Sequence, residues 1–181
     1  MSPSPAHGGG VGEGAFPDNG ASMATAEKTI NSIDELKAMV GQEMGVSEWV
    51  EMTQDRVNQF ADVTGDHQWI HVDVERAKAS PLGGPIAHGF LTLSMLPVLR
   101  QQGWEGVRVN LGAKMGINYG LNKVRFISPV HVGKRIRMRT KLLSVEEVQP
   151  NVYQMINENT VEIEGQAKPA MVAESIGRTY L

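Results

Sequence analysis

One strongly apolar segment, residues 86–99, constrains the fold of this chain more than any other feature. It follows a loop, Ser80–Pro85, that contains two prolines and paired glycines, and it predicts a buried helix over about His88–Gln101. The segment is shorter than the about 20 residues that a membrane-spanning helix needs. Pro97 lies inside it and can kink or shorten the helix. A lone apolar helix of this kind requires a sheet to cover it.

The segments after this helix are predicted to be β-strands separated by turns. They cover about 107–114, 116–127, 135–145, 152–163 and 169–180. In the third, apolar and basic residues alternate, so that a row of Arg135, Arg137, Arg139 and Lys141 faces away from the core. We therefore expect an α+β architecture, in which an antiparallel sheet of about five strands wraps around a long central helix.

Shorter elements are predicted ahead of the central helix. Ser32 and Glu35 form a capping box at the start of one short helix, and Thr53 caps a second helix that ends at Gly65. Residues 46–52 between them are expected to form a strand. Residues 66–71 are predicted to be a loop, and Asp73 to begin a short helix through about 79.

Composition limits the domain organisation and the class of function. Residues 1–25 are rich in Gly, Pro, Ser and Ala, so we expect a disordered tail there and a single domain over 26–181. The chain has no cysteine, which excludes thiolate nucleophiles and thiolate metal ligands. A net charge of −3 does not indicate a nucleic-acid partner, and the N-terminus lacks the pattern of a signal peptide. We expect a cytoplasmic protein with no membrane segment.

The residues with the clearest chemical potential lie in the stretch 64–71. Asp66 directly follows the predicted helix end, and His71 comes five residues later. This spacing in a loop allows a carboxylate and an imidazole to turn towards one point, where they can act on one water as an acid/base pair. The backbone N–H of Gly89, at the start of the central helix, can bind a carbonyl oxygen that gains negative charge.

Structural interpretations of the same residues stay open. Asp66 can bind nearby backbone N–H groups, His71 can be a hydrogen-bonded structural histidine, and His88 can support the loop and the helix start. Asp66, His67 and His71 can also ligate a metal, although the sequence offers no further convincing ligand.

Three motifs and the apolar helix together resemble the MaoC-like dehydratase family, which includes (R)-specific enoyl-CoA hydratases and nodulation-protein-N-like proteins. The motifs are Gly65-Asp66-x4-His71-x-Asp73, Pro85-Ile-x-His-Gly89 and Arg125-Phe-x-x-Pro129-Val-x-Val-Gly133. The resemblance, over about residues 45–180, implies a hot-dog fold and a homodimer with active sites near the subunit interface. It also implies hydration of a trans-2-enoyl-CoA, or of the acyl-carrier-protein thioester, to the (R)-3-hydroxyacyl product, without cofactor or metal.

By the same resemblance, Asp66 and His71 match the catalytic pair, and Gly89 matches the oxyanion donor. Gln68 and Trp69 stand where the family usually has Asn-Pro, and with His88 they are predicted to contact substrate. Arg125 is a candidate for contact with the phosphates of coenzyme A. Two other functions are considered: a hot-dog thioesterase, disfavoured because the central helix has no carboxylate, and a non-catalytic acyl-thioester-binding subunit.

Overall fold

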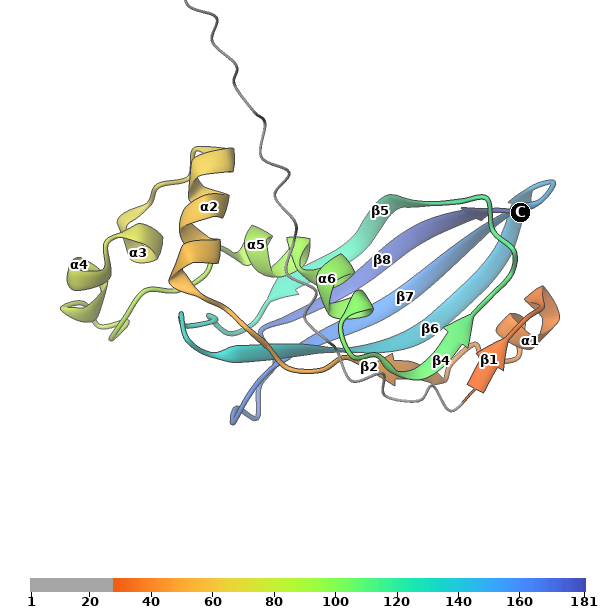
Figure 1. Cartoon of the computed structure of the whole chain (residues 1–181), viewed down its shortest axis with the longest axis horizontal. Helices are drawn as coiled ribbons and strands as arrows, with labels where there is room; N and C mark the ends of the chain where they lie inside the picture. The colour runs from red at the N-terminus through yellow and green to blue at the C-terminus, as the bar shows by residue number, and fades with distance from the viewer. Residues whose placement is uncertain (1–27) are drawn as a thin grey trace, which may run out of the picture.

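A curved, eight-stranded sheet dominates the computed structural model, which describes residues 28–181 (Figure 1). The tail expected at residues 1–25 lies outside the described residues. Neighbouring strands follow the order β1-β4-β2-β6-β7-β8-β5, and β3 pairs with β6. The strands are β1 (Lys28–Ile30), β2 (Glu43–Val46), β3 (Val50–Glu51), β4 (Glu105–Val109), β5 (Met115–Phe126), β6 (Arg135–Gln149), β7 (Val152–Ile163) and β8 (Met171–Tyr180).

The expectation of about five antiparallel strands is wrong in number and in one pairing. β4 to β8 correspond to the five predicted strands, but β1, β2 and β3 from the first part of the chain add to the same sheet. β1 pairs with β4 in parallel, whereas the other paired strands are antiparallel. The strand expected at 46–52 is divided because Ser47 bonds to Met138 through both its backbone and its hydroxyl group.

The caps predicted from sequence are confirmed. The Ser32 hydroxyl accepts from the Glu35 N–H, and Thr53 accepts from the Arg56 N–H. Gly65 ends its helix at φ +76°, a conformation that glycine adopts without steric cost. The helices are α1 (Ile33–Lys37), α2 (Gln54–Thr64), α3 (Trp69–Val72), α4 (Val74–Lys78), α5 (Gly89–Ser94) and α6 (Leu96–Gln101).

The central helix lies against the concave face of the sheet, as expected, but it is two short segments rather than one long helix (Figure 1). α5 ends at Ser94 with Met95 as its C-cap, and Pro97 lies at the start of α6, where its missing N–H interrupts the regular hydrogen bonding. Leu91, Met95 and Leu99 stay buried against the sheet across this break. The hydrophobic core is therefore continuous although the helix is not.

Helices α2, α3 and α4 gather at one end of the molecule, beside the start of α5 (Figure 1). The stretch 66–71, expected to be a loop throughout, contains α3 in its second half. This end of the molecule therefore holds the segments that carry Asp66, His71 and Gly89. No helix among residues 28–181 is long and apolar enough to cross a membrane.

Candidate active site

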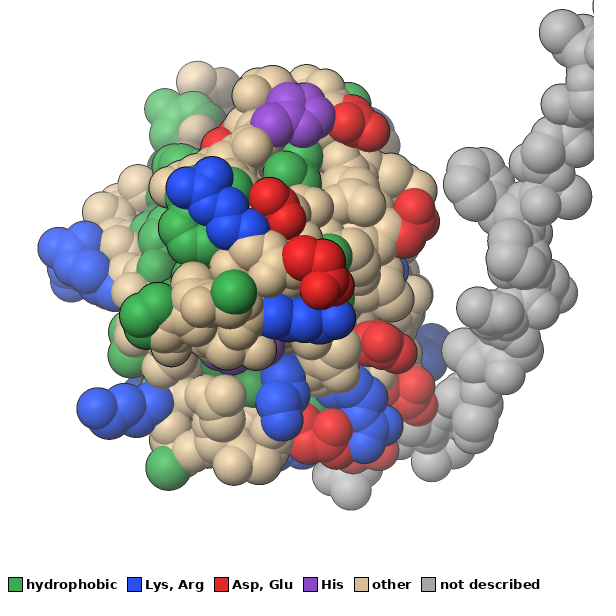
Figure 2. Space-filling view, turned by 90° about the vertical axis from the view of Figure 1, so that its left-hand side faces the viewer, with side chains coloured by type: hydrophobic (Ala, Val, Ile, Leu, Met, Phe, Trp, Pro, Cys, Tyr) green, Lys and Arg blue, Asp and Glu red, His purple; other side chains and the backbone are tan. Residues whose placement is uncertain are grey.

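Asp66, His71 and His88 come together where the end of α2, the short helix α3 and the start of α5 meet. One potential ligand atom from each of the three side chains lies within 4.8 Å of the others. Asp66 is exposed, whereas the two histidines are buried. The outer surface at this end of the molecule carries basic and acidic side chains next to one another (Figure 2). A carboxylate and two imidazoles thus share one small volume that solvent reaches from the Asp66 side.

The His71 ring is held in one orientation by the backbone. Its Nδ1 lies 2.6 Å from the Ile86 carbonyl oxygen, and because a carbonyl only accepts, Nδ1 carries the proton and donates. In the neutral ring this leaves the Nε2 lone pair free to accept. Burial lowers the pKa of His71, since desolvation disfavours the charged form. The backbone of His71 is held as well, because Gln54 Nε2 of α2 donates to its carbonyl at 2.8 Å.

His88 connects the two sides of the site. Its Nε2 donates to the Asp66 backbone carbonyl at 2.9 Å, and its ring stacks on that of His71 with 3.8 Å between centroids. The ring of Phe60 packs near it at a centroid distance of 5.0 Å. His88 is only 2% exposed, and its Nδ1 has no partner among residues 28–181. His88 therefore fixes the main chain at Asp66 and the ring position of His71.

Gly89 is the first residue of α5, and the backbone N–H groups of this first turn have no acceptor within the helix. His88, at the N-cap position, makes no side-chain cap hydrogen bond that would occupy them. A Cβ placed on Gly89 would lie 3.0 Å from the Phe126 ring, so the absence of a side chain permits this close packing. The Gly89 N–H is thus free to bind a ligand beside His88.

A divalent metal ion has one possible set of ligands in the part of the chain that the structure describes, and it is this trio. One nitrogen of each histidine is already committed to a backbone carbonyl, so each ring offers only its other nitrogen. His67, which the sequence suggested as a ligand, lies instead 3.8 Å from Asp62 and is exposed. The possible metal ligands are therefore Asp66, His71 and His88, with His88 in place of the His67 that the sequence suggested.

The remaining predicted substrate contacts are more scattered. Gln68 is exposed and precedes α3, and Trp69 lies beneath the guanidinium of Arg76 at 4.4 Å. Arg125 is exposed on β5 and donates to the neighbouring Val124 carbonyl. These three residues are not members of the Asp66, His71 and His88 cluster, and their contact with substrate stays a prediction.

The basic row on β6 is largely neutralised. Arg135 pairs with Glu164, Arg137 with Glu162, and Arg139 with both Glu43 and Glu162. Because carboxylates already pair with these three guanidinium groups, the three groups are not free to bind the phosphates of a ligand.

Two contributors to the site were not identified from sequence. Phe126 lies against Gly89, and Phe60 packs on His88. The sequence places Phe60 only within the helix that ends at Gly65, and Phe126 only within the predicted strand 116–127. Phe60 is half-buried and Phe126 is 46% exposed, and the apolar pattern of neither segment indicates how near these rings lie to His88 and Gly89. Their role follows from how α2 and β5 approach the start of α5.

Comparisons with known proteins identify the family of this chain. Residues 35–164 match the family model described as the MaoC like domain. The chain is 53% identical over 151 residues to 3-hydroxyacyl-thioester dehydratase Z of Mycobacterium tuberculosis, covering 83% of this chain and 97% of that protein. It is 46% identical over 146 residues to Nodulation protein N of Rhizobium meliloti, covering 80% and 89% respectively.

The fold is shared with solved structures. The (R)-hydratase from A. caviae involved in PHA biosynthesis superposes with a TM-score of 0.60 at 24% identity, covering 76% of this chain and 94% of the other. This likeness shows the hot-dog fold, with a sheet wrapped around a central helix, that the sequence motifs implied. Sequence and fold agree, and the chain belongs to the MaoC-like dehydratase family, whose activity is of the hydro-lyase kind.

Proposed function

We propose that this chain catalyses the reversible hydration of a trans-2-enoyl thioester, carried on coenzyme A or on acyl carrier protein, to the (R)-3-hydroxyacyl thioester. The observation that carries the proposal is the convergence of Asp66, His71 and His88 within 4.8 Å beside the Gly89 N–H. The similarity to a 3-hydroxyacyl-thioester dehydratase supports the reaction class. The (R) configuration rests on the motif resemblance and on the name of the A. caviae neighbour.

The proposed chemistry assigns one task to each group. The His71 Nε2 lone pair and the Asp66 carboxylate accept hydrogen bonds from one water and remove its proton as a coupled pair. The water oxygen forms a bond to C3 of the enoyl group, and the electron pair of the double bond moves towards the thioester oxygen. The Gly89 N–H donates to that oxygen as it becomes negative. A proton then passes from the pair to C2, and dehydration follows the same steps in reverse.

His88 is proposed as a positioning residue in this scheme. It donates to the backbone of Asp66 and stacks on His71, so it acts on substrate through the two catalytic side chains. The half-buried ring of Phe60 packs against the His88 ring and helps to hold it in place. Gln68 and Trp69, at the start of α3 between Asp66 and His71, are proposed to contact the acyl group, and Arg125 the coenzyme.

We also propose that the active unit is a homodimer joined through β5. This strand lies at one end of the sheet order, so one of its edges is unpaired. Its large apolar side chains are 37–53% exposed; they are Met115, Ile117, Tyr119, Leu121 and Phe126. Phe90 of α5 is 68% exposed and packs edge-on against Phe126. A second copy on this surface would cover these side chains next to Gly89.

Hydration of crotonyl-CoA by the purified chain, followed as loss of enoyl-thioester absorbance, tests the proposed reaction. Free thiol is measured in the same samples, because a thioesterase would release it and a hydratase would not. We expect absorbance loss without thiol release and the (R)-3-hydroxy product on chiral analysis. Failure to hydrate enoyl thioesters of short and medium chain length on either carrier would refute the proposal.

A further inference from the structure

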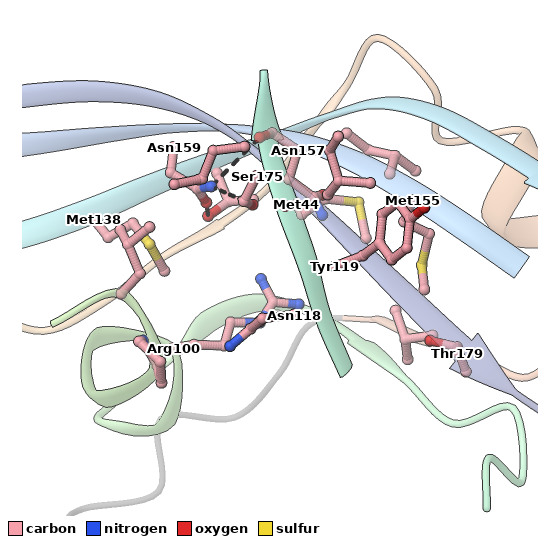
Figure 3. A pocket seen from close by; sticks show the side chains of 18 of the residues that line it. Met44, Arg100, Asn118, Tyr119, Met138, Met155, Asn157, Asn159, Ser175 and Thr179 are labelled. Carbon is pink, nitrogen blue, oxygen red and sulfur yellow. Dashed lines mark hydrogen bonds between the residues drawn. The ribbon is translucent and has the colours of Figure 1, made fainter. Parts of the chain in front are cut away.

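A cavity of about 680 Å³ lies between the central helix and the concave face of the sheet, apart from the three catalytic candidates (Figure 3). Its walls come from the end of α5, from α6, from β5 and from the inner faces of β6, β7 and β8. Leu93, Leu142 and Met155 are among its apolar lining residues. Its size is that of a small-molecule site, and much of its lining suits an aliphatic chain.

The sheet side of this cavity carries a polar patch where apolar residues are expected. Along β6 the inward positions hold Ile136 and Met138, and then Thr140. Asn159 of β7 lies opposite Thr140 in the register, and Asn157 lies opposite Ser175 of β8. Thr140 and Asn159 are 3% and 5% exposed. Burial of such groups is unfavourable unless they find partners, so each polar group of this patch needs a hydrogen-bond partner from the protein or from a ligand in the cavity.

Hydrogen bonds within this patch leave donors aimed at the cavity. The Thr140 hydroxyl donates to Asn159 Oδ1 at 2.9 Å, and Asn159 Nδ2 donates to Ser175 Oγ at 2.8 Å. Ser175 therefore accepts and keeps its own hydroxyl hydrogen. The side-chain amide of Asn157 makes no hydrogen bond within residues 28–181 and also lines the cavity. Both groups can donate to an acceptor placed between sheet and helix (Figure 3).

Arg100 of α6 supplies a positive charge from the opposite wall. Its guanidinium stacks over the Trp104 ring at 3.8 Å and has no carboxylate within ion-pair distance in the described chain. Desolvation lowers the pKa of Arg100 to about 10, although the residue as a whole is exposed, and it lines the cavity. A guanidinium without a carboxylate partner can bind an anionic acceptor with two oxygens through paired hydrogen bonds.

We propose that this cavity binds the far part of an acyl chain that ends in a carboxylate, with Arg100, Asn157 and Ser175 as donors to its oxygens. This inference rests on the proposed function, which places the thioester at the Gly89 N–H. From Gly89 to Leu93 on the cavity wall is about 6 Å along α5, and Arg100 lies beyond the break, in the last turn of α6. The carboxylate is thus recognised well away from the reacting carbons. The substrate class is an enoyl thioester derived from a dicarboxylic acid.

Binding of inert, saturated acyl-CoA pairs by titration calorimetry tests this inference without turnover. Each pair has one chain length and differs only in a terminal carboxylate or a terminal methyl group. We expect the wild-type chain to bind the carboxylate member roughly tenfold more tightly or better. Arg100→Gln should remove that preference while the affinity for the methyl member is kept, and Asn157→Leu should reduce it.

The matched control is Arg108→Gln, which removes an exposed arginine of β4 that does not line the cavity. It should leave the preference unchanged, which separates a local contact from a general loss of positive charge. Equal affinity for both members, no binding of either, or a preference that survives Arg100→Gln would overturn the inference. If carboxylate-selective binding is present but no enoyl thioester is hydrated, the inference about the cavity holds and the proposed reaction fails.

Discussion

Replacement of His71 by Asn and by Ala separates its chemical role from its structural one. His71 is 6% exposed, and its Nδ1 donates to the Ile86 carbonyl at 2.6 Å. An Asn amide can keep that bond while it removes the Nε2 lone pair, so we expect less than about 1 kcal/mol loss of stability. Ala leaves the carbonyl without its donor, which costs about 1–3 kcal/mol in addition to the emptied ring volume. Both should lower kcat by about 10²–10⁴-fold, the usual contribution of acid–base catalysis.

The assay pairs crotonyl-CoA hydration with urea unfolding of the same preparations. We expect a similar loss of activity in both variants. A clearly lower urea unfolding midpoint is expected only for His71→Ala. A His71→Asn variant with wild-type kcat would refute the base role. Equal destabilisation by both variants would refute the importance of the Ile86 bond.

Three further predictions concern pH, packing and assembly. Because burial lowers the pKa of His71 below 6.5, the unfolded chain takes up a proton first as pH falls. The free energy of unfolding should therefore decrease below about pH 6.5. The acid limb of the kcat/KM profile should have its midpoint below pH 6.5, and a midpoint above pH 6.5 would contradict the lowered pKa of His71. Gly106→Ala, at φ +146° against Met44, should destabilise by about 1–3 kcal/mol. Gly84→Ala, where a Cβ would meet nothing closer than 4.0 Å, should be nearly neutral in the same urea experiment, and equal effects would argue against the close approach of β2 and β4. Ile117→Glu should yield monomers by light scattering, whereas Val63→Glu, exposed on α2, should not; an unchanged mass for Ile117→Glu would exclude β5 as the interface.

Local signals in the sequence predicted local structure well. Ser32, Thr53 and Gly65 each satisfy backbone groups within four residues, so their capping roles were readable from the chain alone. The strand Val152–Ile163 was predicted with its observed bounds, and it pairs along its length with β6 on one side and β8 on the other. The same logic predicted a buried central helix, and its apolar residues are indeed in the core.

Features that depend on distant contacts were harder to predict. The division of the strand at Ser47 follows from its bonds to Met138, which is far away in sequence. The central helix breaks at Met95, although Pro97 signalled an interruption without fixing its place. The joining of His88 to Asp66 and His71 depends on how α2, α3 and α5 pack. The spacing of the motif indicated Asp66 and His71 as a pair, whereas only the tertiary structure places His88 beside them.

The most direct test of the central claim is the rate of crotonyl-CoA hydration by the wild-type chain and by Asp66→Asn, measured side by side. Asp66 is exposed and its backbone, rather than its carboxylate, binds His88, so the amide should leave the fold intact. The account predicts hydration by the wild type and a loss of roughly a hundredfold or more in kcat for the variant. Equal rates for the two proteins would contradict the assignment of Asp66 and His71 as the pair that acts on water.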